Sequence, residues 1–332
     1  MAQLIKLQDY VSRYEMDLYR YPSQFVRLKK QQWEKFQVLW EHGEFPVLNE
    51  DANPDGADHK SDVKDKAGVL EKVKGIFRRR DKGNIMAEAA AGVEGEENLF
   101  SLHTQVKKAP KHIQELKQSF LDQLFRVQIT WASSTLVEKS YIDNRYLQDE
   151  RLKFLLQRFP DTFLILYEPI LQLKKAPVEL DVILITPTAL WCLTFLEEEK
   201  EAVYIGSNER FWMKRTGEYE KKVLNPLLAL NRMDSIIKQL FRAYHVDFPI
   251  RKAILCRNGF IDYPMAPQGV QLIDERQFPD WFGTLRQLRS PLKMMQLRAA
   301  KSLLEHGQTK SIRRSEWEKR DDALFAEQDY VE

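Results

Sequence analysis

A single carboxylate, Asp181, stands in a stretch that otherwise consists mainly of apolar, β-branched and aromatic residues. This stretch, residues 178–196, holds two apolar runs around the turn signal Thr186-Pro187-Thr188-Ala189, which predicts a β-hairpin. Because both runs show little alternation, we expect the hairpin inside a sheet that is covered on both faces. A carboxylate there is costly unless it is paired, hydrogen-bonded or bound to a metal ion. Asp181 is therefore the first candidate functional residue, and a capping role at the strand's start is the structural alternative.

The partner of Asp181 across the hairpin follows from the position of the turn. If the turn centres between Pro187 and Thr188, Asp181 faces Thr194. Other reactive residue types form no recognised arrangement: the six histidines and two cysteines lack zinc-ligand spacing, and no phosphate-binding glycine motif or nucleophile elbow occurs. The candidate catalytic or metal-binding site therefore centres on Asp181 and its surroundings.

Composition sets broad limits on the class of protein. The 332 residues are 43% hydrophobic and 30% charged, which indicates a globular chain with a well-solvated surface. The net charge of +2 argues against a uniformly basic nucleic-acid coat but leaves a local basic patch open. No apolar run reaches the ~18 residues of a membrane span, and the start of the chain has no signal-peptide pattern. With Cys192 and Cys256 expected as reduced core thiols, we predict a cytoplasmic protein.

Composition shifts along the chain divide it into segments. We expect an aromatic-rich helical segment first, then a linker too poor in apolar residues to fold, which surrounds a basic amphipathic element. A bridging helix, the main domain and a charged, mobile tail follow. The expected bounds are 1–46 for the helical segment, 47–108 for the linker, 69–80 for the basic element, 109–137 for the bridging helix, 138–306 for the domain and 307–332 for the tail.

Within the domain, periodicity predicts helices on either side of a group of strands. A helix over about 138–159 precedes a strand at 162–167, the hairpin, and outer strands at 202–205 and 210–214. Asn225-Pro226 then opens a long helix, because Asn is a good N-cap and Pro suits the first helical position. Core strands at 250–256 and 270–273 and further helices complete an α/β fold of the mixed-sheet (α+β) kind.

Several of these residues, taken in order, match one known family. Glu179-Leu180-Asp181, Ile185-Thr186-Pro187, Arg210-Phe211-Trp212 and Asn225-Pro226-Leu227 follow one another as in the nuclease-related domain (NERD), which the span from about 140 to 275 resembles. That bacterial family has the restriction-endonuclease-like PD-(D/E)XK fold. The resemblance implies that Asp149, on the preceding helix, joins Asp181 to hold Mg²⁺ or Mn²⁺, and that Glu-x-Lys on the second hairpin strand completes the active site.

This chain departs from the family pattern at the catalytic positions. Thr194 stands where the Glu is expected and Leu196 where the Lys is expected, and neither can hold a metal ion or activate water as those residues do. A Glu-x-Lys occurs four residues onward as Glu198-Glu199-Lys200, but four strand residues advance about 13 Å. We therefore expect a pseudo-nuclease without a cofactor, and keep as the alternative an active Mg²⁺- or Mn²⁺-dependent nuclease. Its catalytic residues would be Asp149, Asp181, Glu198 and Lys200.

Binding is the function that remains for an inactive domain. Basic side chains around the domain could face the phosphates of DNA or RNA, although a plain solvated surface explains them equally well. These residues are Arg210, Lys214, Arg215, Lys221, Lys222 and Arg232. The competing hypothesis is a protein-interaction scaffold in which 1–46 or 69–80 docks on a partner protein.

Overall fold

The computed structural model describes residues 1–43, 109–174, 176–197 and 199–314. The linker expected at 47–108, with its basic element at 69–80, lies outside these residues. The chain forms two compact units, Met1–Lys35 with Phe120–Glu332 and, by itself, Phe36–Ser119. In the described part of the second unit, the indole of Trp40 donates to the carbonyl oxygen of Pro110 at 2.9 Å. The first unit holds the two larger β-sheets and the residues that the sequence singles out for chemistry.

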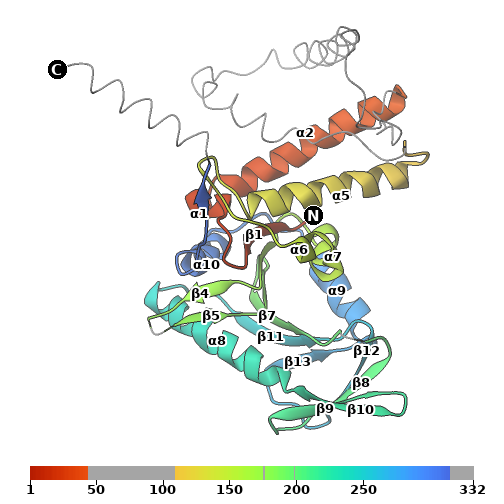
Figure 1. The fold of residues 1–332 in the computed structure, drawn as a ribbon, viewed down its shortest axis with the longest axis vertical. Helices are drawn as coiled ribbons and strands as arrows, with labels where there is room; N and C mark the ends of the chain where they lie inside the picture. Colours follow the sequence, from red (N-terminus) through yellow and green to blue (C-terminus); the bar gives the residue numbers. More distant parts are fainter. Residues whose placement is uncertain (44–108, 175, 198, 315–332) are drawn as a thin grey trace, which may run out of the picture. The chain divides into compact units, whose positions relative to one another are not determined.

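Helices and strands alternate through the first unit (Figure 1). The described helices are α1 (Arg13–Met16), α2 (Tyr21–Glu41), α5 (Ile113–Trp131), α6 (Asn144–Leu147), α7 (Glu150–Arg158), α8 (Pro226–Ala243), α9 (Phe278–Arg286) and α10 (Met294–Leu304). The described strands are β1 (Gln3–Leu7), β2 (Glu138–Lys139), β3 (Leu164–Tyr167), β4 (Ile170–Gln172), β5 (Pro177–Glu179), β6 (Val182–Ile185), β7 (Leu190–Phe195), β8 (Ala202–Ile205), β9 (Phe211–Thr216), β10 (Tyr219–Leu224), β11 (Ile250–Leu255), β12 (Gly259–Asp262), β13 (Val270–Ile273) and β14 (Ile312–Arg313).

A six-stranded mixed sheet with the order β1-β3-β6-β7-β11-β13 forms the centre of the fold. β1 is parallel to β3, and β7, β11 and β13 are parallel to one another, while β6 is antiparallel to both of its neighbours. Five strands therefore end at one edge of the sheet, and β6 begins there. The predicted α/β fold with a mixed sheet is confirmed.

The predicted hairpin is confirmed as β6 and β7. Val182 lies opposite Leu193 and Ile183 opposite Cys192, which is the register that the turn position predicts. The turn is closed by the amide of Thr186, which donates to the carbonyl oxygen of Ala189 at 2.9 Å. Both strands of the hairpin are buried almost throughout, as expected for a central position in a covered sheet.

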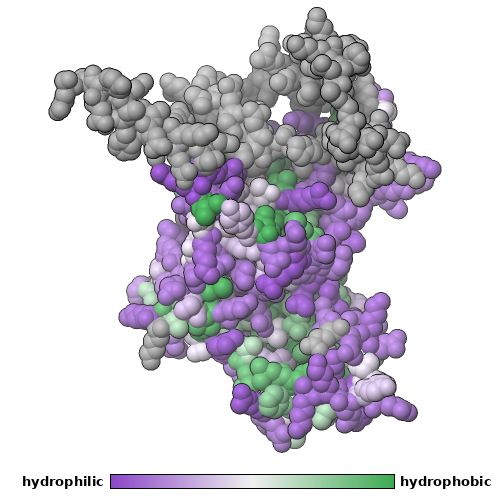
Figure 2. Space-filling model, viewed as in Figure 1, coloured by the Kyte–Doolittle hydropathy of each residue, from purple (hydrophilic) through white to green (hydrophobic). Residues whose placement is uncertain are grey.

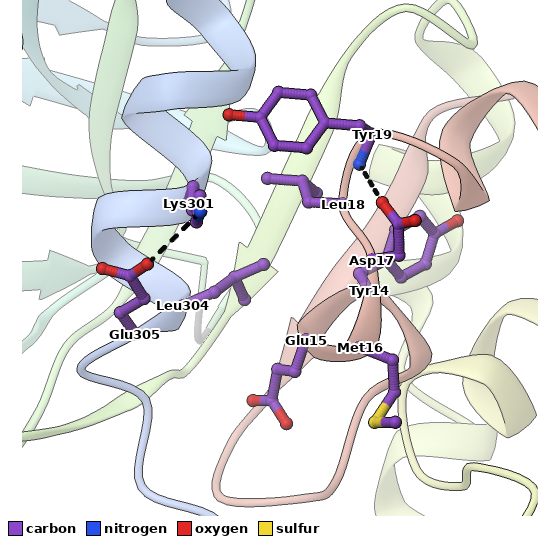
Figure 3. Close-up of a pocket in the computed structure, with 9 residues that line it drawn as sticks. All are labelled: Tyr14, Glu15, Met16, Asp17, Leu18, Tyr19, Lys301, Leu304 and Glu305. Carbon is purple, nitrogen blue, oxygen red and sulfur yellow. Dashed lines mark hydrogen bonds and ion pairs between the residues drawn. The ribbon is translucent and has the colours of Figure 1, made fainter.

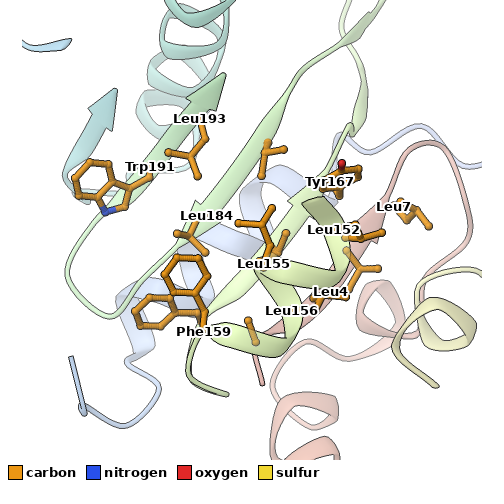
Figure 4. Close-up of a cluster of buried hydrophobic side chains, with 14 of the residues drawn as sticks. Leu4, Leu7, Leu152, Leu155, Leu156, Phe159, Tyr167, Leu184, Trp191 and Leu193 are labelled. Atoms are coloured by element: carbon orange, nitrogen blue, oxygen red, sulfur yellow. The ribbon is translucent and has the colours of Figure 1, made fainter. Parts of the chain in front are cut away.

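The central sheet is covered by different helices on its two faces. On one face, here called the α7 face, Tyr167, Leu184 and Trp191 join a core cluster with Leu152 and Leu156 of α7 (Figure 4). Alternate residues point to the other face, here called the α8 face, where α8 packs on β7 and β11. α8 begins as predicted, with Asn225 as N-cap and Pro226 in its first turn.

A smaller four-stranded sheet has the order β10-β9-β8-β12. β9 is antiparallel to β8 and to β10, and β12 is parallel to β8. The outer strands expected at 202–205 and 210–214 are β8 and β9, whereas β10 and β12 are additional. β10 is an exposed edge strand rich in charge, which explains why it lacks an apolar pattern.

The expectation of a purely helical segment at 1–46 is wrong for its beginning. Gln3–Leu7 forms the buried edge strand β1. Its two polar side chains are buried with partners: Gln3 Nε2 donates to the carbonyl oxygen of Asp161 at 2.7 Å, and Lys6 pairs with Glu15. Hydrogen bonds of this kind offset the cost of burial, which polarity alone does not reveal.

Most aromatic residues that closely follow β1 pack inward, although Tyr19 is 44% exposed. Tyr14 and Phe25 are buried, and their rings lie 6.0 and 5.9 Å from the ring of Trp131 in α5. These rings stabilise the first unit and are not available to a partner protein.

Two further element predictions are corrected. The single helix expected at 138–159 is divided, because Asp143 caps α6 and Asp149 caps α7. The tail expected from residue 307 is ordered at its start, where β14 pairs with β2 and Lys310 forms an ion pair with Asp9 at 2.8 Å. Residues 315–332 lie outside the described part.

Candidate functional site

The edge of the central sheet where five strands end and β6 begins carries a concentration of polar side chains, which we call the polar end. Asp181 precedes β6, and Tyr167 and Glu168 lie at the end of β3. Thr194 and Glu197 lie at the end of β7, and Arg257 lies just beyond β11. The first residues of α7 contribute Asp149 and Arg151. Ligand sites of open α/β sheets commonly lie at this kind of edge.

Asp181 is engaged by the residue that stands opposite it. The Thr194 hydroxyl donates to Asp181 Oδ2 at 2.6 Å, and the Thr194 side chain is buried. The Asp181 carbonyl oxygen accepts the Glu168 amide at 3.1 Å. The Asp181 carboxylate thus accepts a hydrogen bond from a neutral hydroxyl group. That hydroxyl belongs to Thr194, which stands at the position where the resemblance implies a metal-binding Glu.

Asp149 is engaged in a different way. Its Oδ1 accepts the backbone amides of Arg151 at 2.9 Å and Leu152 at 3.0 Å, which makes it the N-cap of α7. Its Oδ2 accepts the Tyr167 hydroxyl at 2.5 Å. Burial, and next the neighbouring Asp149 carboxylate, raise the pKa of Tyr167 well above its ordinary value. Both oxygens of Asp149 therefore have structural hydrogen bonds.

Asp149 and Asp181 are engaged by different hydrogen-bond partners. Tyr167 and Val182 are opposite each other in β3 and β6 and belong to the core on the α7 face, which is also where Tyr167 meets Asp149. Asp181 is bonded to Thr194, which alternates with Leu193 and so lies on the α8 face. Among the described residues, no group of three or more His, Cys, Asp or Glu side chains is placed to hold a metal ion.

The displaced Glu-x-Lys lies beyond the end of β7. Glu198 is outside the described residues, and Lys200 is exposed. The two neighbouring acids form ion pairs: Glu197 accepts from Arg257 at 2.7 Å, and Glu199 accepts from Lys214 at 2.8 Å. The Lys214 and Thr216 hydrogen bonds hold the pKa of Glu199 below its ordinary value.

The nucleic-acid-binding candidates divide into three groups. Arg210, Arg215, Lys221 and Lys222 are exposed on or beside the β9–β10 hairpin, where Arg215 donates to Glu220 at 2.7 Å. Lys214 is wrong as a phosphate contact, because its side chain is only 3% exposed and bonds to Glu199. Arg232 lies apart on α8, where its guanidinium donates to the carbonyl oxygen of Glu179 at 3.4 Å.

Several residues of the polar end were not predicted, and three of them contact its acids. Tyr167, Arg151 and Arg257 orient the acids of the site, and Arg257 donates to both oxygens of Glu197. A polar residue at the last position of a predicted strand is a weak sequence signal for a functional residue, and Tyr167 occupies such a position. Arg151 and Arg257 carry no comparable signal, since their meeting with Glu197 depends on how α7 and β11 lie against β7.

A small pocket between α1 and α10 offers a second place for a ligand (Figure 3). Its acids hold the pocket walls: Glu15 pairs with Lys6, and Asp17 accepts the Tyr19 amide at 2.9 Å. Lys301 of α10 lies near Glu305, with 3.7 Å between the charged atoms. These contacts lie within α10, or within α1 and the segments next to it in the chain, and the groups already have partners in the structure.

Part of this chain is similar to a known protein. No family model matches the chain, and no solved structure matches it significantly. The chain is 32% identical over 133 residues to an RNA 2′,3′-cyclic phosphodiesterase from Geobacillus stearothermophilus. The match covers 39% of this chain and 36% of the relative, so the chain spans about a third of the relative's length. In the part of the chain that the structure describes, no helix is long and apolar enough to cross a membrane.

Proposed function

We propose that this protein is a non-catalytic member of the nuclease-related domain family that binds nucleic acid, RNA in the first place, in the bacterial cytoplasm. The observation that carries the proposal is the 2.6 Å hydrogen bond from Thr194 to Asp181, because it occupies the carboxylate around which a nuclease site would form. The order of elements agrees with the resemblance: α7, β3, the β6–β7 hairpin, the β9 strand and an Asn-Pro helix start follow one another.

Hydrolysis of a phosphodiester by this route needs a bound divalent cation and an activated water. Two carboxylates must share the cation, and a base must stand near the water. Asp149 and Asp181 have separate hydrogen-bond partners on opposite faces of the sheet, and Leu196 cannot act as a base. We therefore assign no cofactor to the protein.

Two observations favour RNA as the ligand. Arg210 and Lys222 are exposed on or beside one hairpin, and cations gathered in this way attract phosphates independently of sequence. The relative that aligns with this chain over 133 residues is named for an RNA substrate. Two buried free thiols, Cys192 and Cys256, fit a reducing cytoplasm.

A second candidate is an active enzyme, because the relative is named a phosphodiesterase. In that case Asp149, Asp181, Glu198 and Lys200 would have to assemble around Mg²⁺ or Mn²⁺. Such an assembly requires both carboxylates to exchange their hydrogen bonds for the metal ion, which the separate partners of Asp149 and Asp181 disfavour.

The test is a binding titration of a short fluorescent RNA by polarisation at several salt concentrations. The proposal predicts affinity at low salt that falls linearly in a plot of log K against log salt. Parallel samples with Mn²⁺ should contain intact RNA, including RNA that ends in a 2′,3′-cyclic phosphate. Absence of binding at low salt would overturn the proposal, and RNA cleavage that Asp181→Ala abolishes would establish the second candidate.

A further inference from the structure

The four-stranded sheet has one buried face and one open face. Its buried face includes Ala202 and Tyr204 of β8, Trp212 and Lys214 of β9 and Ile261 of β12, all with little exposure. Because side chains alternate along a strand, the residues between them point the other way. This open face consists of Val203, Ile205, Phe211, Met213, Arg215, Glu220, Lys222, Leu224, Phe260 and Asp262.

Two apolar side chains of the open face are exposed, whereas Val203, Ile205, Met213 and Phe260 are partly buried. Phe211 is 45% exposed and Leu224 is 55% exposed, and they lie opposite each other in β9 and β10. Leu228, in the first turn of α8 just beyond β10, is 48% exposed. Figure 2 shows a hydrophobic area, with hydrophilic residues around it, where Figure 1 draws β9 and the start of α8. Contiguous apolar surface of this kind commonly marks an interaction site.

Cationic side chains accompany the aromatic rings of the open face. The guanidinium of Arg210 lies 5.6 Å from the ring centroid of Phe211, and that of Arg276 lies 5.6 Å from the ring centroid of Phe260. Lys222 adds an exposed ammonium group on β10. Aromatic rings beside cations are the combination that binds single-stranded nucleic acid, since bases stack on the rings while phosphates meet the cations.

We propose that the open face of the β8–β9–β10–β12 sheet binds single-stranded RNA, with a base stacked on Phe211 and phosphates near Lys222 and Arg215. This inference rests on the proposed function and assigns it a surface. Four strands spaced by about 4.8 Å give a platform roughly 14 Å across, which is wide enough for splayed bases. A duplex hides the faces of its bases, so the platform selects single strands.

Charge favours RNA over a partner protein as the occupant. The edge strand β10 presents Lys221 and Lys222 side by side, and lysines on an edge strand discourage the addition of a further strand. The open face itself carries two acids, Glu220 and Asp262, and two cations, Arg215 and Lys222. Because Glu220 already pairs with Arg215, the positive charge beside the Phe211 ring comes from Lys222 and Arg210.

β10 supplies matched control variants. Lys221 and Lys222 are adjacent and exposed, but Lys221 lies opposite Lys214, on the side of the buried face, and Lys222 lies opposite Met213, on the open face. Tyr219 is the corresponding control for Phe211: it is 84% exposed but points to the same side as Lys221. Substitution of Lys221 or Lys222 removes the same charge from opposite sides of the hairpin. Substitution of Tyr219 or Phe211 removes a comparable aromatic ring from opposite sides of the same hairpin.

The experiment is polarisation titration of a short single-stranded RNA with the full chain and the variants Lys222→Ala, Lys221→Ala, Phe211→Ser and Tyr219→Ser. We expect Phe211→Ser to weaken binding about fivefold or more through lost stacking. Lys222→Ala should lower the salt slope by about 0.7, the value for one phosphate contact on a single strand. The two control variants should bind like the unaltered protein, and a duplex of the same sequence should bind more weakly.

The outcomes separate this inference from the proposed function. If the unaltered chain binds no RNA, both fail. If it binds RNA but the control variants weaken binding as much as their partners do, or the duplex binds equally well, the open face is not the site and the proposed function stands. Phe211→Leu keeps an apolar side chain on the sheet, so normal folding of that variant with weakened binding would exclude misfolding as the cause.

Discussion

The hydrogen bond between Thr194 and Asp181 leads to the sharpest stability prediction. Replacing Thr194 with Val keeps the shape of the side chain but removes the hydroxyl that donates to Asp181 Oδ2 at 2.6 Å. Thr194 is 8% exposed, so water cannot easily replace the lost donor. A hydrogen bond to a charged group contributes about 1.5–3 kcal/mol, and we expect Thr194→Val to reduce the free energy of unfolding by that amount.

Thr194→Ser is the matched control. It keeps the hydroxyl and removes only a methyl group, whose burial contributes about 0.8 kcal/mol. The assay is urea denaturation at neutral pH, monitored by tryptophan fluorescence. The free energies of unfolding of the two variants and the unaltered chain are compared, on condition that their m-values agree. If Thr194→Val proves no less stable than Thr194→Ser, the hydroxyl does not satisfy Asp181 and the account of the polar end is wrong.

Three other predictions follow from single contacts. Asp149→Ala removes the N-cap of α7 and should cost about 1 kcal/mol in urea denaturation, whereas Asp149→Asn, which can still cap, should cost less. Burial disfavours ionised Asp274, but hydrogen bonds from Arg276 and backbone amides outweigh it and hold the pKa of Asp274 below 3.8. Because that pKa is depressed in the folded state, its stabilisation is present above pH 3.8 and lost as the pH falls through the folded-state value. Asp274→Asn should therefore flatten the acid side of the stability profile, and an unchanged profile would contradict the assignment. Glu220→Gln removes an acid of the open face and frees Arg215, so RNA should bind more tightly in the polarisation titration, and equal or weaker binding would count against the open face.

Local patterns were sufficient to predict the centre of the fold. The hairpin register follows from one turn and a period of two residues, and it placed Asp181 opposite Thr194 correctly. The Asn225-Pro226 start of α8 was likewise predicted from capping chemistry. These features depend on neighbours in the sequence, which is why the sequence reveals them.

Features that depend on distant partners were missed. β1 contains Gln3 and Lys6, whose burial makes sense only beside Asp161 and Glu15. Helical phase predicted that Asp149 lies near the core, but phase could not show that it caps α7 on the face opposite to Asp181. The partners of Asp149 depend on the side of the sheet on which α7 packs.

Charge also concealed structure. Glu220, Lys221 and Lys222 make β10 look like a loop, although an edge strand with open faces tolerates such residues. Lys214 shows the reverse error, because a lysine in a charged strand was predicted to be solvent-facing and is buried against Glu199. Pairing with a neighbouring carboxylate is what allows that burial, and only the fold brings the two residues together.

The most direct test of the account is a polarisation time course of fluorescent single-stranded RNA with the protein at low salt, in Mn²⁺ and in EDTA. We predict that binding raises the polarisation equally in both samples and that the signal then stays constant, because the RNA is held and not cut. A signal that decays in Mn²⁺ but not in EDTA, and not with Asp181→Ala, would show a working metal-dependent site and contradict the account.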